Sequence, residues 1–194
     1  MNPPTLLRSS VVACWSFWLA LLCVVPSFAQ GDAQITEFLA SLNGSRAQLT
    51  SPSSSDAAAN CARIATKVMD MGVVVRNTSA RIWDRMSSRQ RDAYRSAALS
   101  WAVRNCVQRN QGSNGEPLEF AGTRRGENGD RLVATRSRAP SHLLVWRLRG
   151  SGKPRAVDLI LDGSSVTFSL RKETESLLER YGDDIDAMIV ELRR

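Results

Sequence analysis

An almost unbroken apolar run opens the chain. Residues 11–25 (VVACWSFWLALLCVV) follow a single charge, Arg8, and precede small residues at Ser27 and Ala29. The run is shorter than the roughly 20 apolar residues that span a bilayer, and the small residues suit a signal peptidase. The pattern predicts an export signal over residues 1–29 with cleavage after Ala29; an uncleaved membrane anchor is the alternative.

Helical periodicity follows this segment. Apolar residues in 34–42 and 61–72 recur at intervals of three or four, as on one face of an amphipathic helix. Residues 43–56 between them are rich in Ser, Asn and Gly and are expected to form a loop, with Asp56 capping the second helix. A further short helix is expected over 73–86.

A capping box marks the start of the next helix. Ser87 and Gln90 have the spacing at which the hydroxyl accepts from a free backbone N–H while the Gln side chain reaches back. This helix is expected to run to about Arg109. One face of it carries Tyr94, Ala97, Ala98, Trp101, Ala102 and Asn105. The alanines leave space beneath the aromatic rings, which either tight helix packing or a cavity explains.

The pattern then changes to period two. Residues 131–137, 142–148 and 155–161 alternate and are joined by short segments containing Gly, Pro and Ser, which indicates an antiparallel sheet. The segment 142–148 is apolar on both faces toward its centre, so it should be the central strand. A further short strand is expected at 117–121.

The C-terminal part returns to helix. Residues 184–194 have a helical pattern, whereas residues 164–181 fit either a strand after an Asp162–Gly163 hairpin turn or a helix. The order of helices, strands and helices predicts the α+β class, with helices packed on a curved antiparallel sheet.

Composition and charge narrow the class of protein. The 194 residues are 43% hydrophobic and 23% charged, which excludes a disordered or collagen-like chain. Residues 30–194 are expected to form a single domain. The net charge of +7 suits a protein that works beside anionic lipid headgroups, and it equally suits an ordinary solvated surface. Export argues against nucleic acid as a partner.

Two of the four cysteines, Cys61 and Cys106, remain after the predicted cleavage. In an exported, oxidising setting such a pair is usually a disulfide. Two buried free thiols are the alternative.

The sequence shows little catalytic chemistry. Gly150–Lys153 resembles the end of a phosphate-binding loop, but it lacks the earlier glycine and the following hydroxyl. His142 is the only histidine, and no cluster of ligands at metal-binding spacing is visible. We therefore expect neither an enzyme nor a metal site.

Two motifs resemble the MlaC family of periplasmic phospholipid carriers, also called the toluene-tolerance or ABC-transporter auxiliary family. Members have an Asp, then Gly-x-Ser, then an Arg-containing helix, and here Asp158, Gly163, Ser165 and Arg171 follow in that order. The upstream helix of the family also has a counterpart in Trp83, Ser87, Gln90, Arg91 and Tyr94. The resemblance covers about residues 62–192.

The resemblance implies a cone-shaped, nuclear-transport-factor-like sheet around an apolar cavity, and a helix within residues 164–181. It implies a bound phospholipid or other lipid as ligand and no other cofactor. It further implies a periplasmic shuttle whose partners are an inner-membrane ABC transporter with a lipid-binding ring and an outer-membrane lipoprotein complex. Such shuttles maintain the lipid asymmetry of the outer membrane.

On this basis we expect a set of apolar side chains to contact the lipid, unless they form a solid core instead. They are Val68, Trp83, Met86, Tyr94, Ala98, Trp101, Leu132, Ala134, Leu144, Trp146, Leu159 and Leu161. Arginines are expected near the mouth, with Arg85, Arg89 and Arg147 as candidates.

The sequence also departs from the family. The aromatic residues that the family has before the Asp and in the following helix fall near Pro154 and Thr174 here. These departures favour a diverged member of the family whose ligand is not an ordinary phospholipid, and the hopanoid-associated branch of the same family is a close alternative. Two other readings remain: an exported protein-interaction module without a deep lipid cavity, and an enzyme on the ketosteroid isomerase-like fold with Asp158 or His142 as its acid or base.

Overall fold

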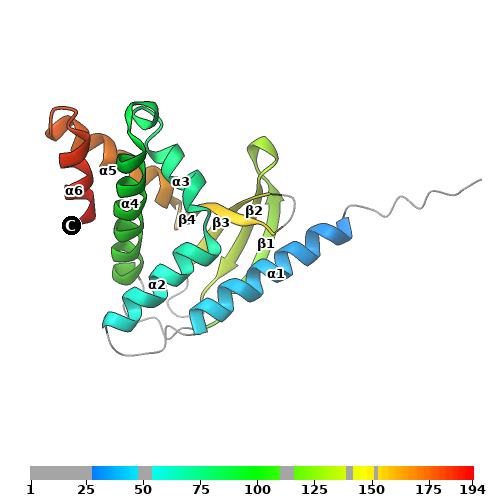
Figure 1. Ribbon diagram of the computed structural model, residues 1–194. Coiled ribbons are helices and arrows are strands. Elements are labelled where there is room, and N and C mark those ends of the chain that lie inside the picture. The colour runs from blue at the N-terminus through cyan, green and yellow to red at the C-terminus, as the bar shows by residue number, and fades with distance from the viewer. Residues whose placement is uncertain (1–27, 48–53, 110–115, 139–141, 151–152) are drawn as a thin grey trace, which may run out of the picture.

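The computed structural model describes residues 28–47, 54–109, 116–138, 142–150 and 153–194 (Figure 1). Most of the predicted export signal, residues 1–27, therefore lies outside the described residues. Among the residues described, no helix combines the length and the apolar character needed to cross a membrane.

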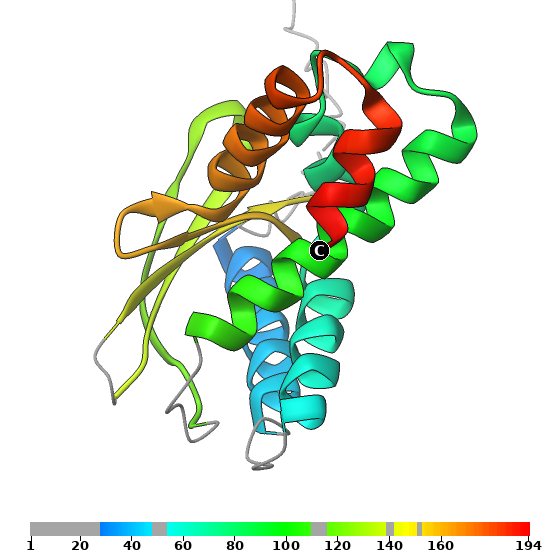
Figure 2. The same ribbon diagram turned by 90° about the vertical axis from the view of Figure 1, so that its left-hand side faces the viewer.

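Five strands form one antiparallel sheet, in the spatial order β1-β2-β3-β4-β5. The strands are β1 (Glu119–Arg125), β2 (Arg131–Arg136), β3 (Leu143–Arg149), β4 (Arg155–Leu161) and β5 (Ser164–Ser165). The three alternating segments are thus strands, and β3 is the central one, as the sequence predicted. Figure 2 shows the curved sheet along one side of the molecule and the helices along the other.

The helices come before and after the sheet in the chain. They are α1 (Phe28–Arg46), α2 (Ser54–Val68), α3 (Met71–Thr78), α4 (Ser88–Arg109), α5 (Val166–Arg180) and α6 (Ile185–Arg193), with short 3₁₀ turns η2 (Trp83–Arg85) and η3 (Glu127–Gly129). The α+β class with a curved antiparallel sheet is confirmed. Helices α1 and α2 lie side by side in both ribbon views.

Helix ends differ from the prediction in the N-terminal part. Helix α1 extends to Arg46, four residues beyond the predicted end, and α2 begins at Ser54, so Asp56 lies inside the helix and is not its cap. The segment expected as one helix over 73–86 is divided into α3 and η2. Thr78 is the last residue of α3. Its hydroxyl donates to the carbonyl of Val74, four residues earlier, at 3.0 Å, and such a side-chain bond competes with the backbone bonds that would continue the helix.

The capping box at the start of α4 is confirmed. The backbone N–H of Ser87 donates to Gln90 Oε1 at 3.0 Å, and the N–H of Gln90 donates to Ser87 Oγ at 3.2 Å. Two backbone donors that have no partner inside the helix are satisfied in this way.

Residues 166–180 are helical, as the family resemblance implied and the local pattern alone did not decide. Ser165 caps α5, since its Oγ accepts from the N–H of Phe168 at 2.9 Å. The same hydroxyl donates to Asp158 Oδ2 at 2.8 Å, and Asp158 Oδ1 accepts from the N–H of Thr167 at 3.0 Å. The motif Asp–Gly-x-Ser therefore ties the start of α5 to strand β4.

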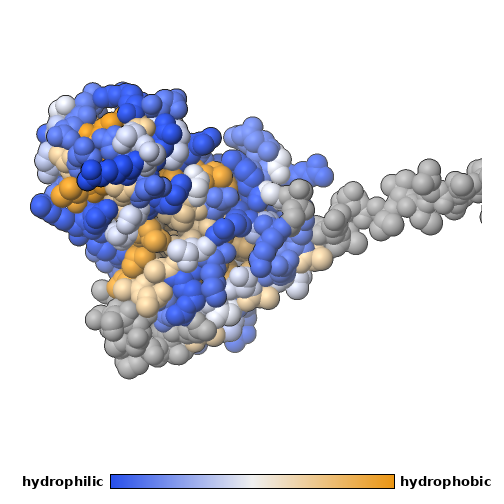
Figure 3. All heavy atoms as spheres, in the orientation of Figure 1, coloured by the Kyte–Doolittle hydropathy of each residue, from blue (hydrophilic) through white to orange (hydrophobic). Residues whose placement is uncertain are grey.

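The hydrophobic core extends from α1, α2 and the inner face of the sheet to α3, α4, α5 and α6, and Tyr94 is fully buried within it. The Tyr94 hydroxyl lies 2.9 Å from both Thr78 Oγ1 and Thr174 Oγ1, so three helices meet at one polar point inside an apolar cluster. On the outside, Figure 3 shows a mostly hydrophilic face with hydrophobic patches beside the lower part of α4 and over α6, where Val190 is 55% exposed.

Candidate functional site

An apolar cavity of about 360 Å³ lies between the sheet and the helices α1, α2, α4 and α5. Aliphatic and aromatic side chains dominate its lining: Leu42, Ile64, Ala65, Met69, Trp101, Ala102, Leu118, Leu144, Trp146, Leu159, Leu161 and Val166. This volume lies within the range of pockets that hold small molecules, and its lining is of the kind that holds apolar ligands.

The sheet side of the cavity follows from strand register. Leu144 pairs with Leu161, and Trp146 pairs with Leu159, across β3 and β4. Side chains opposite one another in an antiparallel pair share a face, so these four form one apolar surface.

Trp146 is fixed in place within that surface. Its ring makes an edge contact with the ring of Phe38, with centroids 5.7 Å apart, and its indole Nε1 donates to Thr135 Oγ1 at 3.0 Å. Only 3% of Trp146 is exposed to solvent. Because both the apolar body and the N–H have partners, this wall of the cavity is firmly packed.

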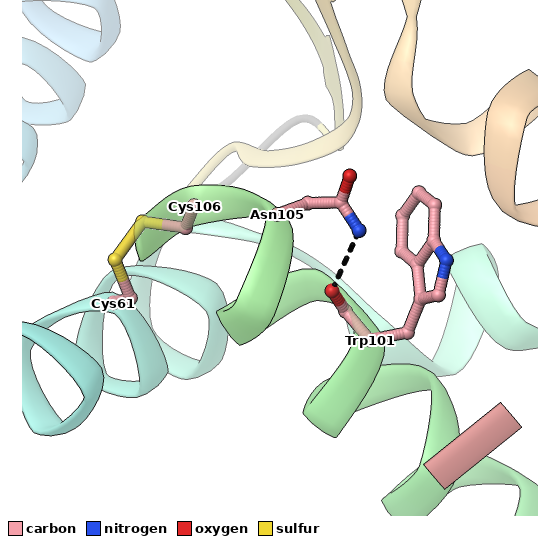
Figure 4. The surroundings of a disulfide bond; sticks show 4 residues. All are labelled: Cys61, Trp101, Asn105 and Cys106. Carbon is pink, nitrogen blue, oxygen red and sulfur yellow. Dashed lines mark hydrogen bonds between the residues drawn. A yellow bond between two sulfur atoms is a disulfide. The ribbon is translucent and has the colours of Figure 1, made fainter. Parts of the chain in front are cut away.

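A disulfide bond forms part of the helix side. Cys61 on α2 and Cys106 on α4 are joined, with their Cα atoms 5.9 Å apart, and both line the cavity. The predicted disulfide is confirmed. Figure 4 shows Trp101 and Asn105 on the same stretch of α4, where Asn105 Nδ2 donates to the carbonyl of Trp101 at 3.0 Å.

Two arginines add positive charge to this lining. Arg46 ends α1, and Arg109 ends α4. Arg46 is only 7% exposed, its Nε donates to the carbonyl of Glu116 at 3.3 Å, and burial lowers the pKa of its guanidinium. A buried guanidinium beside apolar walls is well placed to pair with an anion, because charge-assisted bonds are strong where water is scarce.

His142 and Asp162 line another part of the cavity. His142 Nδ1 lies 2.7 Å from Asp162 Oδ2, and both side chains are about half exposed. Asp158, the other residue considered for acid–base chemistry, does not line the cavity and accepts the hydrogen bonds that hold α5 on β4. Among the described residues there is no group of three or more His, Cys, Asp or Glu that would hold a metal ion.

Five of the twelve residues proposed from sequence as lipid contacts line the cavity: Trp101, Leu144, Trp146, Leu159 and Leu161. Five others pack into or against the hydrophobic core: Val68, Trp83, Met86, Tyr94 and Ala98. Trp83 also lies beneath the guanidinium groups of Arg76 and Arg91, 5.5 and 5.1 Å from its ring centroid.

The placement of Leu132 and Ala134 on the cavity side of β2 is wrong. In the β2–β3 pair, Leu132 is opposite Arg147 and Ala134 is opposite Val145, so both point away from the face of Trp146. Val133 and Thr135 share the sheet face of Trp146 in their place, buried behind the residues that line the cavity. Leu132 and Ala134 give one face of β2 two apolar residues, and Val133 gives the other face one. Alternation alone therefore did not decide which face meets the helices, and the polar Thr135 beside Val133 favoured the wrong choice.

The arginines lining the cavity are also not those expected. Arg85 lies 3.8 Å from Asp183, and neither Arg89 nor Arg147 lines the cavity. Arg46 was missed because α1 was expected to end at residue 42. The signal was present, since Arg46 follows Leu42 by four residues and shares its helix face.

Comparisons with known proteins agree with this architecture. Among solved structures, the phospholipid-binding protein from Ralstonia solanacearum, determined in complex with a phospholipid, superposes with a TM-score of 0.58 at 13% identity. The match covers 86% of this chain and 98% of that chain, and at this identity it shows a shared fold. No curated protein matches the sequence significantly. The family model described as MlaC protein matches residues 32–194, and the chain therefore belongs to the MlaC family.

Proposed function

We propose that this protein binds lipid in the apolar cavity and carries it across the periplasm, between the inner and outer membranes. The observation that carries the proposal is the cavity itself, about 360 Å³ in volume and lined mainly by apolar side chains on the sheet and four helices. The Ralstonia protein of the same fold binds a phospholipid.

Physical chemistry explains why such a cavity suits transport. Each methylene group moved from water into apolar surroundings contributes about 0.8 kcal/mol, so a lipid tail cannot cross an aqueous compartment unshielded. The cavity replaces the bilayer around the tail, while a headgroup at the mouth stays close to water.

The proposed location rests on two features. An export signal over residues 1–29 would direct the chain to the periplasm. The disulfide between Cys61 and Cys106 suits that compartment, because disulfides persist in oxidising surroundings.

The proposed partners follow from the family. The protein acts as the soluble component of an ABC-type transport system, taking or delivering lipid at an inner-membrane transporter with a lipid-binding ring. An outer-membrane lipoprotein complex is the second partner with which it exchanges lipid.

Native mass spectrometry tests the proposal. Residues 30–194, directed to a bacterial periplasm and purified without detergent, should carry adducts of lipid mass that solvent extraction identifies. If the protein shows only its ligand-free mass and also takes up no lipid from liposomes, the proposal is overturned and a protein-interaction module is favoured.

A matched pair of variants locates the binding. Ser169 on α5 lines the cavity, whereas Ser176 on the same helix is exposed. Ser169→Phe should reduce the lipid-bound fraction severalfold because the ring takes up cavity space, and Ser176→Phe should leave it unchanged. Equal loss in both variants, or loss in neither, would place lipid outside this cavity.

A further inference from the structure

Phe120 is an exposed aromatic residue beside the lining of the apolar cavity. It pairs with Thr135 across β1 and β2, and Thr135 pairs with Leu144 on β3, so Phe120 is on the sheet face that borders the cavity. Two residues earlier in the chain, Leu118 is buried and lines the cavity. Phe120 itself is 51% exposed. The apolar surface of the cavity therefore continues outward onto a large side chain that solvent reaches.

Leu143 lies at the same end of the sheet, on the opposite face. It is the first residue of β3, and its neighbours in the chain, His142 and Leu144, both line the cavity. Because successive side chains of a strand point to opposite faces, Leu143 points away from the face of Leu144. It is 45% exposed. Phe120 and Leu143 thus form an apolar lip on the two faces of one sheet end.

The cavity opens at this end. Three of its lining residues are exposed: Arg109 at the end of α4, Asp162 in the turn between β4 and β5, and Ser164 on β5. The end of α4 and this turn both lie toward the left in Figure 2, where the strands of the sheet also end. The apolar lip therefore borders the mouth of the cavity.

The position of the lip is what gives it meaning. A single exposed apolar side chain is ordinary on a protein surface. Here, two of the five large exposed hydrophobic side chains of the described residues lie at the cavity mouth. A lipid tail that moves from a bilayer into the cavity stays out of water only if apolar surface is continuous between the two. Phe120, next to Leu118 and in one cross-strand row with Leu144, supplies that continuity.

Two arginines beside the lip are free to meet anionic headgroups. Arg109 ends α4, and Arg136 ends β2 directly opposite Leu143. Both are exposed, and neither forms an ion pair with a carboxylate of the described residues. Guanidinium groups bind phosphate through paired N–H donors.

The carboxylates at this end lie close to other basic groups. Arg138 Nε donates to Glu119 Oε1 at 2.8 Å, and Glu116 also lies near Arg138. Asp162 Oδ2 lies 2.7 Å from His142 Nδ1. The whole chain has a net charge of +7, which attracts it to an anionic membrane surface.

We propose that this end of the protein docks directly on an anionic lipid bilayer. Phe120 and Leu143 enter the interface between headgroups and acyl chains, Arg109 and Arg136 contact phosphates, and the cavity mouth faces the bilayer. The inference rests on the proposed lipid-binding function and names the surface from which the cavity loads.

Vesicle binding and lipid uptake test the docking. Residues 30–194, freed of ligand, are mixed with vesicles of phosphatidylcholine and phosphatidylglycerol. Flotation measures binding to the vesicles, and native mass spectrometry measures the rate of lipid uptake. Phe120→Ser and Leu143→Ser should each lower both quantities about tenfold, because an apolar side chain that enters the interface is lost.

Val190→Ser is the matched control. Val190 is 55% exposed and lies on α6, which packs on α4 and α5 and is remote from the sheet in Figure 1. Its replacement removes a similarly exposed apolar side chain and should leave vesicle binding and uptake unchanged. An equal loss in Val190→Ser would show that the lip has no special role and would overturn the inference.

A short-chain lipid separates docking from binding in the cavity. Dihexanoyl phosphatidylcholine dissolves as a monomer and needs no bilayer, so the Phe120 and Leu143 variants should bind it as wild type does. If these variants lose this binding together with vesicle uptake, while urea unfolding shows them folded, the two residues belong to the lipid site and the docking role is overturned.

Wild type itself distinguishes the inference from the function. If it binds the short-chain lipid but neither floats with vesicles nor takes lipid from them, the inference is overturned, loading from a protein partner is favoured, and the carrier function stands. If it binds neither lipid, both are overturned.

Arginine variants test the preference for anionic headgroups. Arg109→Gln and Arg136→Gln should each weaken binding to the mixed vesicles about fivefold and change binding to pure phosphatidylcholine vesicles little. Arg124→Gln, an exposed position toward the other end of β1, should change neither. Unchanged binding to the mixed vesicles in both Arg109→Gln and Arg136→Gln would overturn the proposed headgroup contacts.

Discussion

Trp146 and Thr135 are joined across the sheet by a hydrogen bond from the indole Nε1 to the threonine Oγ1, at 3.0 Å. Neither residue reaches solvent appreciably, since Trp146 is 3% exposed and Thr135 is 0% exposed. The bond lets a large ring with a polar N–H form the wall of an apolar cavity without an unsatisfied donor.

Removing this acceptor should destabilise the protein. Thr135→Val keeps the shape of the side chain but leaves the indole N–H buried and unpaired, so we expect the free energy of unfolding to fall by about 1–3 kcal/mol. Urea unfolding followed by circular dichroism measures it. Thr123→Val is the control: Thr123 is exposed on β1, so losing its hydrogen bond to the carbonyl of Leu132 should lower the free energy of unfolding less. Equal stability of Thr135→Val and wild type would contradict this role.

The disulfide between Cys61 and Cys106 should contribute most of its stabilisation through the unfolded chain. It closes a sequence separation of 45 residues, for which the chain-entropy model gives roughly 4 kcal/mol. The double variant Cys61→Ala, Cys106→Ala should therefore unfold at lower urea concentration. A reducing agent should destabilise wild type to a similar degree and leave the double variant unchanged; a wild type insensitive to reduction would argue against the bond.

The buried Tyr94 should make stability fall at alkaline pH. Burial raises its pKa above the ordinary 10.0, although hydrogen bonds to Thr174 and Thr78 act the other way. The unfolded state loses its proton first, so this contribution is fully present below pH 10 and is lost as pH rises through the raised pKa.

Tyr94→Phe separates the two effects of that hydroxyl. At neutral pH the variant should lose about 0.5–1.5 kcal/mol, because Thr78 and Thr174 lose the Tyr94 hydroxyl as a partner but still donate to the carbonyls of Val74 and Leu170. Above pH 10 its unfolding free energy should fall less steeply than that of wild type. Tyr181→Phe, at an exposed position, should follow the wild-type profile; identical profiles for all three proteins would contradict the role of Tyr94.

Asp158 is expected to act in folding and not in chemistry. Asp158→Ala removes the acceptor of bonds from Ser165 Oγ and the N–H of Thr167, so the melting temperature should fall with a loss of about 1–3 kcal/mol. Asp184→Ala, which removes the exposed cap of α6, is the control and should cost about 1 kcal/mol. Lipid binding should survive in the folded Asp158→Ala protein, and its complete loss there would assign Asp158 a direct role.

Strand prediction shows where local pattern suffices and where it does not. Alternation located β2, β3 and β4 and the central place of β3, because each strand's own residues carry that signal. Leu132 and Ala134 were placed on the wrong face, because β2 is apolar on both sides and its phase depends on pairing with β3. A one-residue change of phase moves every side chain to the other face.

The cavity could be predicted only in part. Leu144, Trp146, Leu159 and Leu161 were identified from alternation in strands that do face it. Tyr94 and Ala98 were indistinguishable from cavity residues, because an apolar helix face has the same periodicity whether it meets a neighbouring helix or an empty space.

The sequence alone predicted most of the element types, the α+β order, the capping box at Ser87 and the pairing of the two cysteines, because these depend on residues near one another or on a single pairing; it left residues 164–181 undecided between strand and helix. The three-dimensional packing was needed to show that Arg46 lines the cavity, that Tyr94 is buried in the core, and that a cavity of about 360 Å³ lies between the sheet and the helices. Those features depend on strand register, helix length and the packing of segments distant in the chain, which no local period encodes.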